Sequence, residues 1–434
     1  MSGGSWEVPG QAAAVRVLRE AVGRGEVSHA WAFLGPAGVG QEQAARWLVA
    51  ALNCPNTVDG VPDGTCDVCD RSRRGAHPAY WEFAPAGTVH RVVEVREQWL
   101  AAAFRTASEG RWKVLRVVDA DRMNEPAANA FLKGLEEPPP NTVWVLDVVD
   151  PDELPDTILS RCRTVRFVPW TPADLDAEAQ RLGLDGADRD LAVRAALGSP
   201  PALARLAGPG GLDDLRTHRE IPRRLRVEGQ GYALVAARAI DDEAKRRAAA
   251  LKEAGRAEVA DLDELYGGAP PRGVVKQVEE RSARRERESR LSTVQSALDD
   301  LVGWYRDCLL IGAAGPSATM ATSASGPATP AAEAATGAAK AARSGAEAAT
   351  PAAGPETAGQ RSALPVAGSA LAAVVHADDV EALRADAAAL PPAVILASID
   401  RVLVTREDLE LNLQQTLSLE ALFLDLATLA LTAA

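Results

Sequence analysis

The feature that most constrains this chain is a glycine-rich loop with the spacing of a phosphate-binding loop. The sequence GPAGVGQE over residues 35–42 places Gly35 and Gly40 at the two ends of the pattern G-x-x-x-x-G-K-[ST], with Gly38 between them. In that pattern the lysine neutralises the phosphates and the hydroxyl binds Mg²⁺. Gln41 stands where the lysine is required. The loop therefore keeps its glycines and lacks its cation.

Glu42 stands where the pattern requires a serine or threonine. At an effective dielectric constant of about 20, two unit charges about 4 Å apart interact by roughly 4 kcal/mol. A carboxylate at this position would therefore repel a bound phosphate. We expect the loop to be retained for its backbone path and not for nucleotide chemistry, although backbone amides alone can form a weak nucleotide site.

The size and composition of the chain predict a soluble protein with more than one domain. Its 434 residues suit two or three domains, and its net charge of −13 argues against a generally basic surface for nucleic acid, although a local patch stays open. Three of the five cysteines are clustered, which favours a reducing cytosol over a disulfide framework. We find no signal peptide and no apolar run of membrane-spanning length, and we expect a cytoplasmic protein without membrane contact.

Residues 1–168 are predicted to form an α/β module with a parallel sheet flanked by helices, because short apolar strands alternate with helical segments. The glycine loop follows the first strand, and a helix is expected over 42–52. The expected strands cover residues 31–34, 81–83, 114–118, 143–149 and 165–168.

The remainder of the chain is predicted to be helical. Residues 169–210 are rich in alanine and leucine and predict a small helical lid, and residues 211–312 predict the first part of a C-terminal helical domain. Within it, the charges of residues 274–290 alternate in sign, which favours a solvated helix face over a nucleic-acid-binding arm. Residues 289–310 show one apolar stripe at helical spacing.

A segment of low complexity interrupts this helical domain. Residues 313–363 are almost entirely alanine, glycine, proline, serine and threonine, and they hold too few apolar side chains to offset the entropy of ordering them. We predict a disordered linker there. Helical patterning resumes over residues 364–434, which we expect to complete the C-terminal helical domain.

A second stretch has the frame of a Walker B motif, a hydrophobic strand that ends in an aspartate. The sequence VLRVVDAD covers residues 114–121, and its Asp119 is the residue that normally helps to hold Mg²⁺. Ala120 follows, so a glutamate that would polarise the attacking water is missing at that position. Asp121 lies one residue too far along and is expected to point elsewhere if the chain is still extended.

Several motifs resemble those of the bacterial clamp-loader family of AAA+ proteins. The resemblance covers residues 9–210 well and the C-terminal region only in general character. It is carried by NAFLKGLEEPPP (129–140), LSRC (159–162), GQ (10–11), HAW (29–31) and VHRVVEVR (89–96). Within this family the incomplete loop resembles that of the delta-prime type and not that of the ATP-hydrolysing gamma/tau type.

This resemblance implies a role for Arg161, which lies between Ser160 and Cys162 in the SRC motif. In clamp loaders the SRC arginine projects towards ATP bound in the neighbouring subunit, where a guanidinium stabilises the charge of phosphoryl transfer. The structural alternative is that Arg161 caps the preceding helix or pairs with Asp156 or Asp152.

Two further positions that sense nucleotide in this family also lack their usual residues. After the fourth strand the family places a threonine, serine or asparagine, whereas this chain has Val148 and Val149. In the lid an arginine usually follows Gly-Ser, whereas Pro200 and Pro201 follow the pair at 198–199. The resemblance therefore implies four altered catalytic parts, and ATP is expected to be bound by the neighbouring subunit.

Cys54, Cys66 and Cys69 lie just after the first helix of the module. Clamp-loader subunits often carry four cysteines here and bind zinc tetrahedrally, whereas this chain has Ser72 at the fourth position. The resemblance thus implies a possible structural zinc site.

The fourth zinc ligand is open at this point. Asp70, His77 or water could fill it, and the alternative is a degenerate knuckle with free thiols. Cys162 and Cys308 are expected to be packing residues.

Taken together, the resemblance predicts an α/β AAA+ module, a helical lid and an all-helical collar-type domain. It implies a delta-prime-like subunit that is not catalytic alone but belongs to the DNA-directed DNA polymerase (nucleotidyltransferase) holoenzyme. The expected partners are the gamma/tau and delta subunits, the sliding clamp and, through the complex, primed DNA. The alternatives are an ATP-hydrolysing gamma/tau-like subunit, or an inactive AAA+ interaction protein outside replication.

Overall fold

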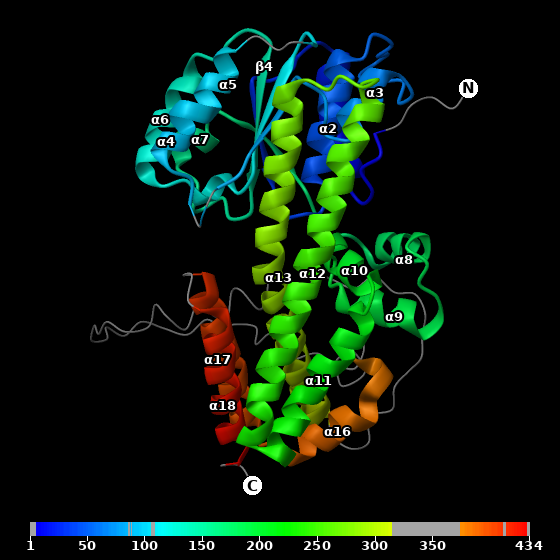
Figure 1. The fold of residues 1–434 in the computed structure, drawn as a ribbon, viewed down its shortest axis with the longest axis vertical. Coiled ribbons are helices and arrows are strands. Elements are labelled where there is room, and N and C mark those ends of the chain that lie inside the picture. The colour runs from blue at the N-terminus through cyan, green and yellow to red at the C-terminus, as the bar shows by residue number, and fades with distance from the viewer. Residues whose placement is uncertain are drawn as a thin grey trace, which may run out of the picture.

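A five-stranded parallel sheet organises the N-terminal lobe of the computed structural model (Figure 1). The structure describes residues 6–85, 87, 89–105, 109–314, 374–410 and 414–431. The strand order is β2-β3-β4-β1-β5, and every pair of neighbouring strands is parallel. The strands are β1 (Ala30–Leu34), β2 (Tyr80–Phe83), β3 (Lys113–Val117), β4 (Thr142–Val148) and β5 (Arg163–Arg166).

Helices cover both faces of this sheet, so its central strands are mostly apolar, with Lys113 and Arg116 of β3 and Asp147 of β4 as buried charged exceptions. One face packs on α1 (Ala12–Gly23), α2 (Gln41–Asn53) and α3 (Asp67–Arg73) through a core that includes Trp31, Phe33 and Leu48. The other face holds Trp99, Phe131 and Trp144 in edge-to-face contacts. Its elements are α4 (Val92–Glu94), η1 (Val95–Leu100), α5 (Ala101–Phe104), η2 (Ala120–Arg122), α6 (Glu125–Glu136) and α7 (Asp156–Leu159).

The strand predictions are confirmed to within one residue at each end, except at the last strand. A strand was expected over 165–168, but β5 covers Arg163–Arg166 and so begins and ends two residues earlier. Three of its four residues are exposed because β5 lies at the edge of the sheet. The apolar residues on which the prediction rested therefore begin inside β5 and continue beyond its end.

Three short helices follow the sheet in the region predicted to be a lid. They are α8 (Pro172–Arg181), α9 (Gly186–Ala195) and α10 (Pro200–Ala207). Thr171 begins α8 with a capping box that includes Asp174, and Ser199 accepts a hydrogen bond from the Ala202 amide at the start of α10. These caps fix where each helix begins.

The C-terminal part is entirely helical in its described residues, so the predicted fold class of an α/β module followed by helical regions is confirmed. Of the predicted linker at 313–363, only the first two residues are described, and they end α13; the rest lies outside the described residues. The elements are α11 (Gly211–Glu228), α12 (Gln230–Leu265), α13 (Arg272–Ala314), η3 (Ala377–Asp379), α16 (Val380–Ala389), α17 (Pro392–Glu410) and α18 (Gln415–Leu431).

The helices α12 and α13 form a long antiparallel hairpin that reaches from the C-terminal lobe to the N-terminal lobe (Figure 1). Its root packs in a core with α11, α17 and α18 that includes Ile240, Leu298 and Phe423. Its tip lies against the N-terminal lobe. With 36 residues, α12 is about 54 Å long at 1.5 Å per residue.

The prediction that residues 274–290 form a solvated helix face holds for one side of α13 only. On that side Lys276, Glu279, Glu280 and Arg287 are exposed. On the other side Val274 and Val278 are buried, and the Arg281 side chain is only 4% exposed and pairs with Glu258 of α12. Part of the alternating charge therefore belongs to a contact with α12 and the N-terminal lobe.

In the described part of the chain no single helix meets the length and apolarity needed to cross a membrane. One pair of helices, Ala377–Ala389 and Pro392–Leu409, meets the criteria only when taken together, and it bends by 106° at its break.

A buried histidine joins three helices of the C-terminal lobe. His218 of α11 lies 2.9 Å from a carboxylate oxygen of Asp300 on α13 and 3.0 Å from one of Glu243 on α12. Burial opposes the charged form, but the hydrogen bonds to Asp300 and Glu243 outweigh it and raise the pKa of His218 to about 9. The histidine is therefore a cation between two carboxylates at neutral pH.

This histidine is expected to make stability depend on pH. Because its folded pKa lies above its ordinary value of 6.5, its contribution is full below pH 6.5 and is lost as the pH rises through 9, on the order of 3 kcal/mol. The fall in Tm between pH 6.5 and 9.5 should therefore be smaller in His218→Gln than in the wild type. The exposed His29, changed to glutamine, is the matched control. Equal falls in wild type and His218→Gln would contradict this role.

Candidate functional site

The glycine loop lies between the end of β1 and the start of α2, at the carboxyl edge of the parallel sheet. The Gly35 amide donates to the Val148 carbonyl at 3.0 Å, and Gly40 is the N-cap of α2. Parallel α/β sheets bind their ligands at this edge, and the start of the following helix attracts phosphate. The loop therefore lies where a phosphate-binding loop belongs.

Two of the glycines are required by contacts within the chain itself. A Cβ on Gly35 would lie 2.2 Å from the carbonyl oxygen of Phe167, and its φ is 150°. A Cβ on Gly38 would lie 2.5 Å from Cγ of Pro201, and its φ is 77°. Pro201 lies in the first turn of α10, so the lid region packs directly on the loop. The glycines thus have a structural reason to remain without any phosphate.

Gln41 holds the loop together from within. Its side chain is 3% exposed, and its Nε2 donates to the Pro36 carbonyl at 2.7 Å. The Val39 carbonyl accepts from Gln11 Nε2 at 3.0 Å and from Trp170 Nε1 at 2.8 Å. Side-chain amides and an indole thus bind the loop carbonyls. Among these described contacts, no cation is supplied for a phosphate.

Glu42 is paired with two arginines instead of facing open solvent. It pairs with Arg46 one turn along α2, and with Arg285 of α13 at 3.3 Å. Burial alone would raise the pKa of Glu42, but Arg46, Arg116 and Arg285 together lower it. The residue is therefore an ionised partner in a salt-bridge network. The repulsion estimated for a bare carboxylate is an upper bound, because the arginines offset part of its charge.

The Walker B-like strand ends in a different geometry from the extended one expected. Asp119 has a φ of 50°, and the residues Ala120–Arg122 form a turn of 3₁₀-helix. Ala120 is fully buried in the core, and Asp121 Oδ2 accepts from the Asp150 amide at 2.9 Å. Asp121 thus ties the end of β3 to the loop after β4, and the position that would polarise a water carries a methyl group.

The other positions expected to sense nucleotide offer no hydroxyl or cation. Val148 is buried at the end of β4, and Val149 is 48% exposed just beyond it. Pro200 and Pro201 form the first turn of α10. The start of a helix at Pro200 and Pro201 could be predicted from the sequence, since proline is favoured in the first turn. The packing of Pro201 against Gly38 could not be predicted from it.

Arg161 lies at the surface, in the turn that follows α7. Its Nη1 donates to the Thr157 carbonyl at 2.7 Å, and its Nη2 lies 2.7 Å from Glu136 Oε1. Because Thr157 belongs to α7, Arg161 caps the preceding helix, as one structural alternative expected. The expected pairing with Asp156 or Asp152 is not what the structure has; Glu136, from the LEEPPP stretch, is the partner. The two side chains are 38% and 51% exposed, and such surface pairs contribute about 0–1 kcal/mol. A more strongly charged anion can therefore displace Glu136.

The other two residues of the SRC motif, Ser160 and Cys162, make contacts within the chain. Ser160 donates weakly to the Thr157 carbonyl at 3.5 Å. Cys162 packs against the core on the α6 side of the sheet, and burial raises the pKa of its thiol to about 12. Cys162 is therefore a neutral packing residue at pH 7, and so is Cys308, whose burial raises its thiol pKa to about 12.

The clustered cysteines form a possible metal site with one carboxylate. The ligand atoms of Cys54, Asp63, Cys66 and Cys69 all lie within 4.8 Å of one another. The sulfurs of Cys54 and Cys66 are 3.7 Å apart. Zinc–sulfur bonds of about 2.3 Å in a tetrahedron require sulfur atoms about 3.8 Å apart, so the donor set fits Zn²⁺.

Asp63 is the fourth group of this cluster, which corrects the sequence-based candidates. Asp70 pairs with Arg73 and Arg74, and His77 Nδ1 accepts from the Ala79 amide. Ser72 is fully buried and does not belong to the cluster. Asp63 could not be recognised from the sequence, because it belongs to no cysteine motif and precedes Cys66 in a turn.

Hydrogen bonds fix the Asp63 carboxylate next to the sulfurs. Its Oδ1 accepts from the amides of Thr65 and Cys66 at 2.9 and 3.0 Å, and its Oδ2 accepts from Asn56 at 2.6 Å. The amide of Asn56 and the two backbone N–H groups hold the pKa of Asp63 well below its usual range. An ionised, oriented carboxylate of this kind is a suitable oxygen ligand for a divalent metal.

Comparison with known proteins agrees with these motifs. Residues 10–171 match the family described as DNA polymerase III, delta subunit. The DNA polymerase III subunit delta' of Pseudomonas aeruginosa is 35% identical over 192 residues, which is 43% of this chain and 58% of that protein. The subunit delta' of Bacillus subtilis is 33% identical over 165 residues, which is 37% of this chain and 49% of that protein.

A relative of the tau kind is similar to a comparable degree. The DNA polymerase III subunit tau of Escherichia coli is 34% identical over 156 residues, which is 36% of this chain and 24% of that protein. The chain thus spans between about a quarter and three fifths of the lengths of these relatives. Residues 10–171 therefore match the delta-subunit family of DNA polymerase III, and the chain is similar both to delta' and to tau subunits.

Proposed function

We propose that the chain is a delta-prime-like subunit of the clamp loader, which does not hydrolyse ATP itself. Arg161 would reach ATP held by a neighbouring gamma/tau subunit and stabilise the charge that develops during hydrolysis. The assembly, with the delta subunit, would load the sliding clamp on primed DNA in the cytoplasm during replication. The chain would thus contribute to the polymerase holoenzyme without a reaction of its own.

The interior of the glycine loop is the observation that carries this proposal. Gln41 binds the Pro36 carbonyl where a lysine would bind phosphate, and Glu42 is committed to Arg46 and Arg285. Pro201 packs against Gly38 from the other side. A nucleotide would have to displace these contacts, and the nearby cations, Arg46 and Arg285, are already paired with Glu42.

The exposed position of Arg161 supports the second half of the proposal. A guanidinium binds phosphate through two parallel N–H donors, and only weak surface contacts hold this one. A ligand presented by a neighbouring subunit would gain more from Arg161 than Glu136 does, because phosphate carries more charge than one carboxylate.

An ATP-hydrolysing gamma/tau-like subunit is the second candidate, because the tau relative is about as similar as the delta' relatives. An inactive AAA+ protein outside replication is a third. In that candidate the exposed Arg161 of the SRC motif would have no ligand in a neighbouring subunit.

The proposal predicts that the isolated chain does not bind nucleotide. Titration with a fluorescent ATP analogue and Mg²⁺ should show no saturable binding below about millimolar concentration, because the loop supplies no cation. The neighbouring gamma/tau subunit, titrated under the same conditions, is the positive control. Micromolar binding by the chain, or hydrolysis by it alone, would favour the gamma/tau-like candidate.

Substitution of Arg161 tests the trans-acting role. In a reconstituted loader with clamp and primed DNA, Arg161→Ala should lower the ATPase rate at least tenfold, on the scale of a lost arginine finger. Arg161→Lys should recover little, because lysine lacks the planar fork.

Glu136→Gln is the matched control for this experiment, because it removes the intramolecular partner of Arg161 and leaves the guanidinium in place. We expect Glu136→Gln to hydrolyse ATP at nearly the wild-type rate. If both variants lose activity equally, or if Arg161→Ala assembles and hydrolyses normally, Arg161 has only a structural role.

We further propose that Cys54, Asp63, Cys66 and Cys69 hold a structural zinc ion. The purified chain should contain about one zinc per molecule by elemental analysis, and a chelator should lower its Tm. Cys69→Ser and Asp63→Ala should reduce the zinc content, whereas Asp70→Ala should not. A wild-type chain that takes up no zinc when refolded with it would refute the site, and full zinc retention in Asp63→Ala would remove Asp63 from it.

A further inference from the structure

The tip of the α12–α13 hairpin makes a second connection between the two lobes. The chain already joins them once, through α8, α9 and α10. A single tether of this kind leaves the relative orientation of two lobes free to change. The hairpin is rooted in the C-terminal core and contacts the N-terminal lobe near α2, α3 and β2 (Figure 1). The two lobes are thus joined at two separate places, by the chain through α8, α9 and α10 and by the tip of the hairpin.

The apolar part of this contact is small. Ala76 of the N-terminal lobe is buried with Leu262 of α12 and with Val274 and Val278 of α13. The hydroxyl of Tyr266, at the tip, donates a hydrogen bond to the Ala76 carbonyl. Because this cluster has only four buried members, apolar burial supplies a limited part of the docking energy.

Arg281 binds the backbone of the N-terminal lobe directly. Its Nη1 donates to the Gly75 carbonyl at 3.1 Å, and its Nη2 to the Arg74 carbonyl at 3.4 Å. A Cβ on Gly75 would lie 2.8 Å from Nη1 of this arginine, and the φ of Gly75 is 64°. A glycine is thus needed where the guanidinium approaches.

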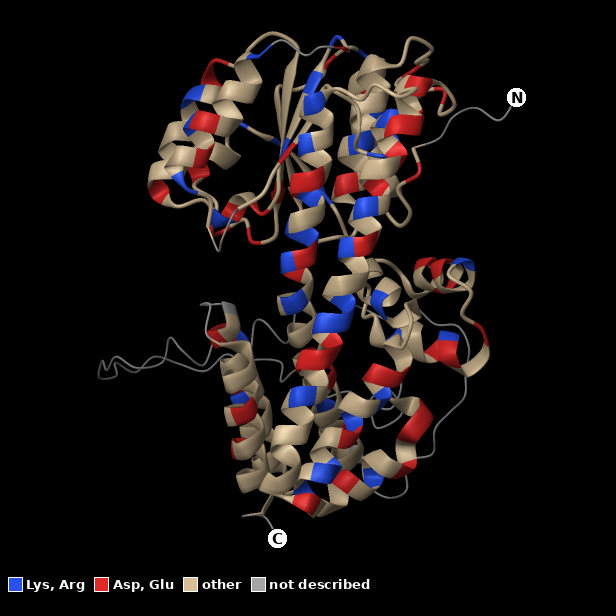
Figure 2. Cartoon of the chain, in the orientation of Figure 1, with Lys and Arg blue, Asp and Glu red and all other residues tan. Residues whose placement is uncertain are grey.

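Two further arginines of α13 bind acidic groups of the N-terminal lobe. Arg284 pairs with Glu82 of β2, and Arg285 pairs with Glu42 at 3.3 Å and with Glu258 of α12 at 3.4 Å. Figure 2 shows blue and red segments alternating along this part of the hairpin. Glu82 is 7% exposed, so it needs cationic partners close by.

The groups that pair directly in this contact balance in charge only when the hairpin is docked. The N-terminal lobe supplies three carboxylates, of Glu42, Glu82 and Asp147, and two guanidiniums, of Arg46 and Arg116. The hairpin adds three guanidiniums, of Arg281, Arg284 and Arg285, and two carboxylates, of Glu258 and Glu288. Withdrawal of the hairpin would leave the N-terminal lobe with three partly buried carboxylates and only two guanidiniums to neutralise them.

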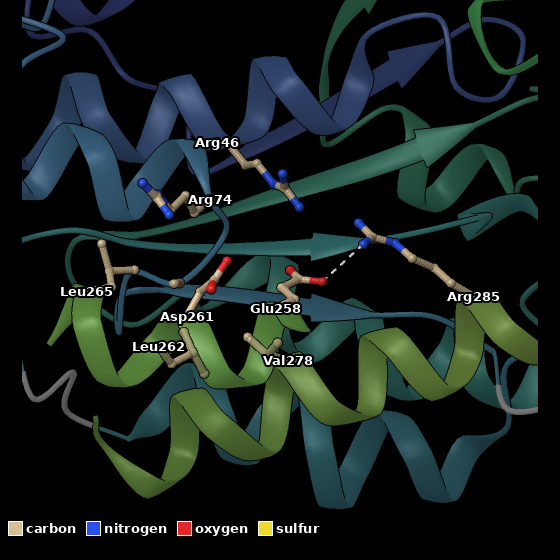
Figure 3. A pocket seen from close by; sticks show the side chains of 9 residues that line it. Arg46, Arg74, Glu258, Asp261, Leu262, Leu265, Val278 and Arg285 are labelled. Carbon is tan, nitrogen blue, oxygen red and sulfur yellow. Dashed lines mark hydrogen bonds and ion pairs between the residues drawn. The ribbon is translucent and has the colours of Figure 1, made fainter. Parts of the chain in front are cut away.

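The contact also contains a cavity of about 240 Å³ between the two lobes (Figure 3). Arg46 and Arg74 line it from the N-terminal lobe, and Glu258 and Arg285 line it from the hairpin. Long charged side chains thus span the interface without filling it. Such an interface contributes less packing energy than a close-packed core, and it can open while both lobes stay folded.

We propose that the α12–α13 hairpin is an intramolecular strut that fixes the orientation of the N-terminal lobe mainly through charge. Glu42, which occupies the position of the Mg²⁺-binding hydroxyl, serves as one of its docking acceptors. This inference concerns the chain alone, and it holds whether or not the chain joins a clamp loader.

Charge reversal in the full-length chain tests the strut. In Arg284→Glu/Arg285→Glu, hydrogen exchange of residues 258–285 and 74–83 should rise at least tenfold, while that of β4 and α18 stays at the wild-type level. Small-angle scattering should show a wider distribution of distances. The control Lys276→Glu/Arg287→Glu changes the same net charge at exposed positions of the same helix. Unchanged exchange in the test variant, or an equal rise in the control, would overturn the proposal.

A charge swap tests the role of Glu42. Arg285→Glu alone should weaken docking, and Glu42→Arg combined with Arg285→Glu should restore part of the protection of residues 258–285. If the double variant is no better protected than Arg285→Glu, Glu42 is not a docking acceptor.

A measurement on the wild type guards against variants that unfold. Raising NaCl from 0.05 to 0.5 M should increase exchange at residues 258–285 several-fold and leave β4 unaffected, because salt screens the partly exposed pairs. Insensitivity to salt would show that charge does not hold the strut.

Discussion

The buried guanidinium of Arg116 is the constraint on which the arrangement of the lobes depends. Arg116 lies on β3, and it pairs with Glu82 of β2 at 2.7 Å and with Asp147 of β4 through two nitrogens. A buried charge costs several kcal/mol unless its partners satisfy it. Three neighbouring strands therefore carry charge on one face of the sheet, where parallel sheets are normally apolar. The arginines of α13 complete the neutralisation of that face.

The glycine loop shows that the glycines of a sequence pattern can be required by packing alone. Gly35 is required by the Phe167 carbonyl and Gly38 by Pro201, and both are contacts within the folded chain. Gln41, whose side chain is one atom shorter than that of lysine, donates to the loop itself. The loop therefore remains a turn between β1 and α2, and the position of α2 depends on it.

The sequence allowed the α/β module and its helical continuation to be predicted, because buried parallel strands such as β4 hold an apolar run, here residues 143–146. It did not allow the edge strand β5 to be placed, because an exposed edge strand lacks such a run. The sign-alternating part of α13 was assigned to solvent because local charge patterning does not reveal a partner about 200 residues away, such as Glu82 for Arg284.

The same limit applied to the candidate site. The three cysteines and Arg161 were identified from their motifs, whereas Asp63 and Glu136 were found only in the structure. Each of the latter is an ordinary acidic residue whose importance comes from its position in space. Asp63 lies outside the motifs and Glu136 lies within one, but the role of each became visible only when the fold placed it next to the cysteines or next to Arg161.

The pairing of Glu42 has a consequence for how this chain can change over time. A return to a nucleotide-binding loop would replace Glu42 with a hydroxyl residue, and Arg46 and Arg285 would then lose an acceptor. A lysine at position 41 would also lose the bond that Gln41 makes to the Pro36 carbonyl. A single substitution at either position would therefore remove contacts before any nucleotide affinity was gained. A position that takes part in the packing of two lobes can change only together with its partners, so a change at Glu42 requires several simultaneous substitutions.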